Sequence, residues 1–177
     1  MKRNKNLIII LIAGLIVFLS LCGAVIAYMF RQTEYNDNQF TPAEVSCDVL
    51  ESFDGEKKTS IQVKNTGNID AYLRVRLVSY WVDADGNVVA KPSSLPSFVP
   101  NNGWVKGSYD TYYFATPVAP NASTVSLLTD AITLRQEDGC MQVIEVFAEA
   151  LQSKPTNAVT SAWGVSLDAS GAINTAP

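Results

Sequence analysis

The sequence predicts an all-β domain, a two-sheet antiparallel sandwich of jelly-roll or immunoglobulin-like type, preceded by one N-terminal hydrophobic helix. Short runs of alternating apolar and polar residues recur along 43–152, and turn-forming residues separate them. About seven or eight such strands imply two sheets packed face to face. The helix is predicted because residues 7–30 form an uncharged run of 24 residues, and roughly 20 apolar residues cross a bilayer.

The N-terminal segment is typical of an exported or membrane-anchored chain. Three basic residues precede the apolar run and only Arg31 closely follows it, so the positive-inside rule places the N-terminus in the cytoplasm and the remainder outside. The run is longer than a usual secretory signal, which favours a retained anchor, whereas Val25-Ile26-Ala27 favours cleavage between Ala27 and Tyr28 by signal peptidase. Both alternatives stay open.

Three regions follow from this pattern. Residues 1–30 are a signal peptide or membrane anchor, 31–42 are an extended, mostly uncharged linker, and 43–177 are the β-sandwich domain. We expect this domain at the cell surface or outside the cell, and membrane-anchored if residues 7–30 are retained.

Charge and composition limit the kinds of partner. Residues 1–31 hold four basic and no acidic residues, which leaves 9 basic against 17 acidic residues in 32–177, a net charge of −8. Nucleic acids and anionic lipids require a basic surface, so we expect neither to bind this domain. The sequence contains no histidine, which removes the usual general base and zinc ligand. We therefore expect no enzymatic activity and no cofactor.

The first two strands are expected at 43–53 and 59–65, with a turn between them. Apolar residues alternate with polar residues in both, as Ile61 and Val63 do in the second. Because successive side chains of a strand point to opposite sides, these residues should face the core.

The next connection is expected at Asn65-Thr66-Gly67-Asn68. Asparagine and glycine tolerate positive φ, and asparagine side chains cap turns. These residues therefore predict a turn between 59–65 and the strand at 71–82.

The strand at 71–82 has one aliphatic and one basic face. Period two places Leu73, Val75, Leu77 and Trp81 toward the core and Tyr72, Arg74, Arg76, Val78 and Tyr80 on the other side. On an acidic domain, Arg74 and Arg76 could pair with carboxylates of the same sheet or of a neighbouring molecule. We consider these two arginines candidates for an assembly contact.

The middle of the chain predicts further short strands. Asp85-Gly86 is a strong hairpin signal, and the three prolines of 91–103 predict an irregular loop. Residues 104–118 and 124–135 are expected to be strands, with turns at 119–123 and 136–139.

Residues 140–152 fit two periods. As a strand, every second residue from Ile144 to Ala150 lines one face; as a helix, Val143, Phe147 and Leu151 stack. We favour the strand because valine and isoleucine open the run and the surrounding domain is β. Residues 157–168 predict either a short helical turn or a terminal strand.

The acidic motifs give weak indications of chemistry. On a strand, Glu145 and Glu149 would lie about 13 Å apart, beyond the roughly 9.5 Å of inverting glycosidases. Residues 83–87, DADGN, resemble the start of an EF-hand loop, but Val88 and Leu95 replace its required glycine and glutamate. A solvated strand face and a plain hairpin turn are the better interpretations.

The aromatic residues of 104–114 offer a binding alternative. Trp104, Tyr109, Tyr112, Tyr113 and Phe114 could form a platform on which sugars stack, although such residues more often fill a core. A surface adhesin or carbohydrate-binding module is therefore the alternative function.

Two cysteines lie outside the apolar run. Cys47 and Cys140 could form one disulfide in an oxidising compartment, stabilising the fold by a few kcal/mol at most. Two free thiols are the other alternative.

Several motifs together resemble the TasA and camelysin family of exported proteins from Gram-positive bacteria. They are AVIAYMF, NQFTPAEVSCDVLE, VKNTGNIDAYLRVRL, WVDADGNVV, YDTYYFATPVAPNASTVSLLTDAIT, and the closing IEVFAEALQ with AWG. The similarity runs from about residue 7 to about residue 165.

This resemblance implies a jelly-roll domain exported through a dedicated signal peptidase and, for some members, assembly into extracellular matrix fibres. In fibre-forming members the segment after the signal donates a strand to the next subunit. Residues 28–41 would occupy that place here, so self-association or related matrix subunits are the implied partners. An unpaired sheet edge accepts such a peptide through backbone hydrogen bonds.

Overall fold

The structure, a computed structural model, describes residues 2–32 and 42–177. The chain divides into two compact units, 1–41 and 42–177. The linker prediction for 31–42 and the donor-strand prediction for 28–41 fall mainly on residues 33–41, which lie outside the described residues.

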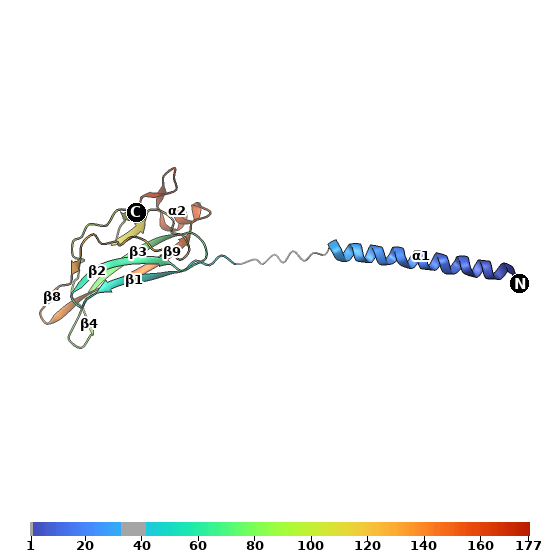
Figure 1. The fold of residues 1–177 in the computed structure, drawn as a ribbon. Coiled ribbons are helices and arrows are strands. Elements are labelled where there is room, and N and C mark those ends of the chain that lie inside the picture. The colour runs from blue at the N-terminus through green and yellow to red at the C-terminus, as the bar shows by residue number, and fades with distance from the viewer. Residues whose placement is uncertain (1, 33–41) are drawn as a thin grey trace. The chain divides into compact units, whose positions relative to one another are not determined.

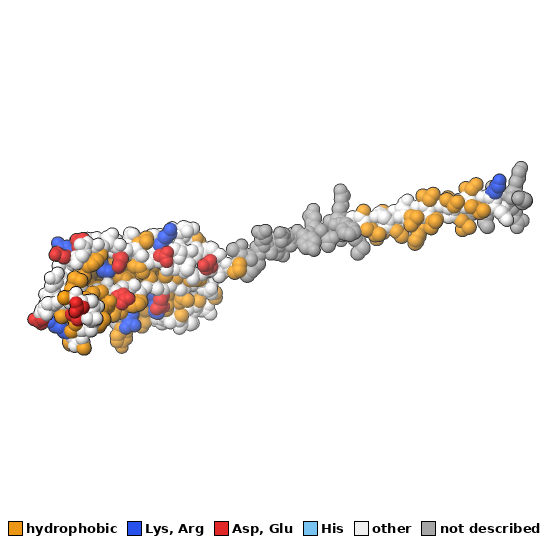
Figure 2. All heavy atoms as spheres, turned by 90° about the horizontal axis from the view of Figure 1, so that it is seen from below, with side chains coloured by type: hydrophobic (Ala, Val, Ile, Leu, Met, Phe, Trp, Pro, Cys, Tyr) orange, Lys and Arg blue, Asp and Glu red, His pale blue; other side chains and the backbone are white. Residues whose placement is uncertain are grey.

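The described residues of the first unit form one helix, α1 (Lys2–Gln32). Its apolar span, Ile8–Tyr28, covers 21 residues with a mean hydropathy of 3.0, and none of it is buried. Figure 2 shows apolar side chains exposed along the helix. At 1.5 Å per residue the span measures about 32 Å, enough for a hydrocarbon core of about 30 Å. The predicted hydrophobic helix is confirmed, and it suits either a signal sequence or a membrane span.

The second unit consists mostly of antiparallel β-structure (Figure 1). Its elements are β1 (Cys47–Phe53), β2 (Lys57–Asn65), β3 (Ala71–Val82), β4 (Val88–Val89), β5 (Trp104–Lys106), β6 (Thr111–Phe114), β7 (Ile132–Thr133), β8 (Gln136–Glu137), β9 (Cys140–Gln152), α2 (Asn157–Trp163), β10 (Ser166–Leu167) and β11 (Ile173–Thr175). They form sheets ordered β1-β2-β7, β5-β6-β3-β9-β8 and β10-β11, with β4 paired to β3. The β-rich prediction is confirmed.

The centre of the larger sheet is the pairing of β3 with β9. Twelve residue pairs join them without a register shift, from Ala71 opposite Gln152 to Val82 opposite Met141. Residues 140–152 are therefore a strand, as favoured. The helical period in this sequence does not produce a helix, because every second side chain of the strand faces the core.

The main core lies where the β1–β2 pair packs against the inner faces of β3 and β9. Ile61 and Val63 from β2 join Leu73 and Val75 from β3 in one buried cluster, together with Ile144 from β9. Figure 1 shows β1 and β2 alongside β3 and β9. The predicted inward faces are confirmed.

A second, smaller cluster covers part of the outer face of β3. Trp163 and Val159 of α2, with Ile173 of β11, pack on Tyr72 and Tyr113. Tyr72 is only 1% exposed, although it lies on the same side of β3 as the two arginines. Period two gave its side of the strand correctly, but residues about 100 positions later cover that side.

The turn at 65–68 has only part of the predicted physical basis. An asparagine side chain caps it as predicted, since Asn65 Oδ1 accepts a hydrogen bond from the Gly67 N–H. None of its residues has positive φ. Instead, a Cβ on Gly67 would lie 2.3 Å from the carbonyl oxygen of Glu44. Glycine is required because two backbone segments approach closely.

Two other predictions are corrected in detail. Of 124–135, only Ile132–Thr133 is a regular strand, although Leu127 and Leu128 are buried. Residues 157–168 contain both predicted alternatives in succession, since α2 is followed by β10.

Candidate functional site

Arg74 lies at the centre of a structured polar site in the second unit. Its Nε and Nη2 both donate hydrogen bonds to Oε2 of Glu149, at 3.1 and 2.7 Å. The cross-strand register of β3 and β9 places these two residues directly opposite each other. The guanidinium also lies 4.8 Å from the ring centroid of Trp163 and 5.8 Å from that of Tyr113. One carboxylate and two aromatic rings therefore fix this cation in place.

Arg76 occupies the same face of β3 but has a different environment. Its side chain is exposed, and no hydrogen bond or ion pair of Arg76 occurs among residues 42–177. Its neighbours across the strands are Thr111 on β6 and Phe147 on β9. The predicted exposure of both arginines is thus correct for Arg76, whereas Arg74 is half-buried.

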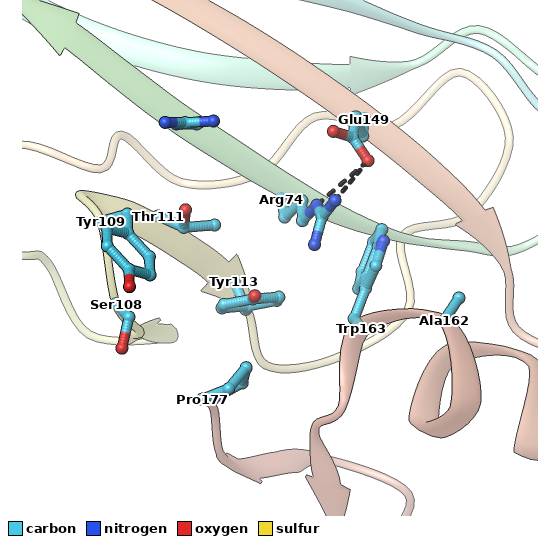
Figure 3. A pocket seen from close by; sticks show the side chains of 10 residues that line it. Arg74, Ser108, Tyr109, Thr111, Tyr113, Glu149, Ala162, Trp163 and Pro177 are labelled. Carbon is cyan, nitrogen blue, oxygen red and sulfur yellow. Dashed lines mark hydrogen bonds and ion pairs between the residues drawn. The ribbon is translucent and has the colours of Figure 1, made fainter.

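A cavity of about 370 Å³ opens between these arginines and the residues around them. Its lining comes from β3, β6, β9, α2, the 107–110 turn and the residues after β11. It comprises Arg74, Arg76, Ser108, Tyr109, Thr111, Tyr113, Glu149, Ala162, Trp163 and Pro177. Figure 3 shows Tyr109, Ser108 and Thr111 on one side, with Arg74 and Trp163 on the other. We call this cavity the arginine pocket.

The turn beside the arginine pocket is strained. Tyr109 and Asp110 both adopt positive φ, 53° and 54°, at the two central positions of a turn closed by the Thr111 N–H donating to the Ser108 carbonyl. Such turns favour Asn-Gly because a bulky side chain there is costly. The Tyr109 ring nevertheless stands 86% exposed.

The predicted aromatic platform does not form. Trp104, Tyr112 and Tyr113 are buried, and Trp104 donates its indole N–H to the carbonyl of Val125. Burial also raises the pKa of Tyr112 to about 12. These rings fill the core, and of the predicted set only Tyr109 stands largely in solvent.

Two of the long strands in the second unit, β1 and β9, have an edge without a partner among the described strands. β1 pairs only with β2. β9 pairs with β3 along its length, but on its other side it meets β8 only at Cys140 and Met141. Beyond Gln142, that edge of β9 is open.

The open edges of β1 and β9 face each other across two hollows. One, of about 610 Å³, lies between residues 45–47 and 148–151. The other, of about 330 Å³, lies between Val49 and Glu51 on one side and residues 143–146 on the other. Together they follow both strands, and we call them the edge groove.

The hydrogen bonds show which backbone groups point into the edge groove. The Gln142 N–H donates to the carbonyl of Arg135, which is on the β8 side of β9. The Ser153 N–H donates to the carbonyl of Asp70, which directly precedes β3 and is on the other side. Because neighbouring residues of a strand direct their N–H groups to opposite edges, the N–H groups of Ile144, Val146, Ala148 and Ala150 face the groove. They are a ladder of donors without strand partners.

Of the two alternatives for Cys47 and Cys140, this structure has two free thiols and no disulfide between them. Cys47 lies beside 148–150 of β9, whereas Cys140 begins that strand. The strand rise places these positions roughly 30 Å apart, far beyond the approximately 6 Å between Cα atoms of a disulfide. Burial, Asp48 and Glu149 raise the pKa of the Cys47 thiol.

The DADGN residues form the predicted hairpin turn between β3 and β4. Asp83 Oδ1 accepts hydrogen bonds from the backbone N–H groups of Asp85 and Asn87, so its carboxylate caps the turn. Gly86 supplies the positive φ of 84°. Within the described residues, no group of three or more acidic or cysteine side chains could hold a metal ion.

The remaining predicted positions lie in the expected elements. Glu145 and Glu149 are both exposed on one face of β9, and Glu149 is paired with Arg74. Ala27 and Tyr28 lie within α1, which continues to Gln32.

Comparisons of this chain with protein-family models, with curated proteins and with solved structures find no match.

Proposed function

We propose that this chain is an exported, non-enzymatic structural protein of the cell surface or extracellular matrix, whose copies assemble by strand addition at the edge groove. Its second unit is, in this proposal, a two-sheet sandwich of jelly-roll type. The resemblance to the TasA and camelysin family motivates the proposal. The open edges of β1 and β9 are the observation that carries it.

The open edges suit assembly because unpaired backbone groups attract another strand. Soluble proteins usually protect such edges with short strands, prolines or covering loops. Here the open edge of β9 extends from Val143 to Gln152 without a proline. The two strands also carry exposed apolar side chains, such as Phe53 of β1 and Phe147 of β9. An added strand would satisfy the groove-facing N–H groups and cover apolar surface.

The occupant that we propose is the 28–41 segment of a second copy. Fourteen residues reach about 46 Å when extended, which exceeds the roughly 33 Å of the ten-residue β9 edge. Signal peptidase would release this segment by cutting between Ala27 and Tyr28. Without cleavage, α1 would hold each subunit at the membrane, with the domain outside.

An adhesin or carbohydrate-binding module that uses the aromatic platform of residues 104–114 has less support. The platform of residues 104–114 would need an exposed Trp104, and this side chain belongs to the core. Nucleic acid remains an unsuitable partner, because 32–177 carries a net charge of −8.

The test blocks the β9 edge without altering the β3–β9 pairing. Ala148→Pro removes an N–H that faces the groove, and proline is tolerated on an open strand edge. We expect the exported wild-type protein to form fibres or ladders in electron micrographs, and Ala148→Pro to raise the concentration needed for assembly roughly tenfold. Deleting 28–41 should abolish assembly.

The matched control is Lys106→Pro on β5, the opposite edge of the same sheet. Gly107 N–H donates to Thr111 on β6, so the Lys106 N–H points away from β6. This variant should assemble normally. Unchanged assembly of Ala148→Pro at an unchanged unfolding temperature, or a strictly monomeric wild type with an intact 28–41 segment, rejects the proposed function.

A further inference from the structure

We propose that the arginine pocket binds an acidic sugar, with Arg76 receiving the sugar carboxylate and Tyr109 stacking on the sugar ring. The arginine pocket shares Arg74, Glu149, Ala162 and Trp163 with the edge groove. Arg76 and Tyr109 line only the arginine pocket, so variants of these two residues test this inference separately from edge assembly.

The charge of the arginine pocket indicates an anionic ligand. Among the side chains that line it, two are guanidinium groups and one, Glu149, is a carboxylate; Pro177 also lines it, and its carbonyl oxygen accepts a hydrogen bond from the Ser108 N–H. Glu149 is already hydrogen-bonded to Arg74, so the charge of Arg76 is left without a partner in the described structure. The side chains of this cavity thus carry more positive than negative charge, in a domain whose residues 32–177 have a net charge of −8.

The geometry favours a planar acid such as a carboxylate. Glu149, Trp163 and Tyr113 hold Arg74 in one position, and Arg76 projects from the same face of β3 two residues later. A fixed cation beside an accessible one forms a two-point site for a carboxylate, and guanidinium forks match this geometry well.

The strained turn indicates what else the ligand contains. The Tyr109 side chain is held in solvent at the rim by a backbone conformation that tyrosine rarely adopts. Strain of this kind is found at functional sites more often than elsewhere. An exposed aromatic ring can cover the apolar face of a sugar ring, while the Ser108 and Thr111 hydroxyls can bond sugar hydroxyls.

These features favour a sugar over an acidic peptide. A peptide carboxylate would use the arginines but would need neither the exposed ring nor the hydroxyl groups. The cavity of about 370 Å³ is within the size range of small-ligand sites, about 300–1,000 Å³.

The test is calorimetric titration of the full chain in neutral detergent with hexagalacturonate. The matched ligands are its fully methyl-esterified form, which keeps the rings but loses the charges, and hexaglutamate, which keeps the charges but loses the rings. We expect binding of hexagalacturonate only, weakening as salt is raised.

Two variants separate the proposed roles. Arg76→Gln should weaken hexagalacturonate binding by roughly tenfold or more. Tyr109→Gly should weaken it by roughly threefold to tenfold, while the unfolding temperature stays the same or rises because glycine accepts positive φ. Lys57→Gln, which removes an exposed cation of β2 outside the pocket, should change the affinity by less than about twofold.

Three results overturn the proposal. Equal binding of the methyl ester shows that charge is not recognised, and equal binding of hexaglutamate shows an acidic-peptide surface instead. Unchanged affinity of Arg76→Gln in a folded protein removes the carboxylate site.

Discussion

Asn65 joins separate segments of the second unit through one fully buried side chain. Its Nδ2 donates to the carbonyls of Ile69 and Val118, both at 2.8 Å, and its Oδ1 accepts from the Gly67 N–H at 3.0 Å. Its backbone N–H donates to Ala122. Every polar group of this residue therefore has a partner, and those partners lie up to 57 positions away along the chain.

We predict that Asn65→Ala destabilises the protein by about 2–4 kcal/mol, because it leaves buried backbone groups without partners. Denaturant unfolding monitored by tryptophan fluorescence measures this change. The control is Asn68→Ala in the same turn, which removes hydrogen bonds to the exposed Pro42 and Glu44 and should cost about 1 kcal/mol or less. Equal losses for the two variants would contradict the role given to burial.

Sequence periodicity predicts the environment of some single residues and not of others. It placed Leu73 and Val75 correctly because alternation depends only on the local chain. It could not show that α2 and β11 cover Tyr72, or that Glu44 forces a glycine at position 67. The partners in these contacts are distant in sequence, so no local pattern reports them.

At the level of elements, the segment 121–127 lies beside β2 as an irregular third strand. Thr124 and Leu127 donate their N–H groups to Val63 and Ile61, at 2.9 and 2.7 Å. In return, the Val63 N–H donates to the Thr124 hydroxyl at 3.0 Å, not to a backbone carbonyl. A side chain thus completes the ladder where the backbone departs from strand geometry.

We predict that Thr124→Val, which conserves volume but removes the hydroxyl, destabilises the protein by about 1–3 kcal/mol. Hydrogen exchange should become faster specifically at the Val63 amide, because this N–H loses its acceptor. Thr124→Ser keeps the hydroxyl and serves as the control, with normal protection at Val63. Unchanged exchange at the Val63 amide in Thr124→Val would show that this hydrogen bond does not stabilise the structure.

The comparison between 124–135 and 140–152 explains which strands could be predicted. Both sequences contain alternating apolar residues, but only 140–152 pairs regularly along its whole length, because β3 lies beside it. In 124–135, serine and threonine hydroxyls compete with the backbone for hydrogen bonds. The pattern predicted a strand in both segments; the structure buries apolar residues of both but pairs only 140–152 regularly.

At the level of the whole molecule, the candidate sites depend on pairings between distant segments. The arginine pocket needs β3 beside β6 and β9, and the edge groove needs β1 opposite β9. The sequence indicated Arg74 and Arg76 as outward-facing cations. It could not predict that Trp163, Tyr109 and Glu149 lie beside these arginines, because alternation of apolar and polar residues carries no information about strand order.

The same strand order decides the chemistry of the two cysteines outside α1. Cys47 and Cys140 lie near opposite ends of β9, so a bond between them would require the central sheet to break. A disulfide closing a loop of this length would stabilise the protein by up to roughly 4–5 kcal/mol. We predict instead that wild type and Cys47→Ser/Cys140→Ser unfold at denaturant concentrations that reducing agent does not change. Thiol titration of the denatured wild type should find both cysteines reactive. A reductant-sensitive midpoint in the wild type alone would mean that the two strands adopt a different order in the exported protein.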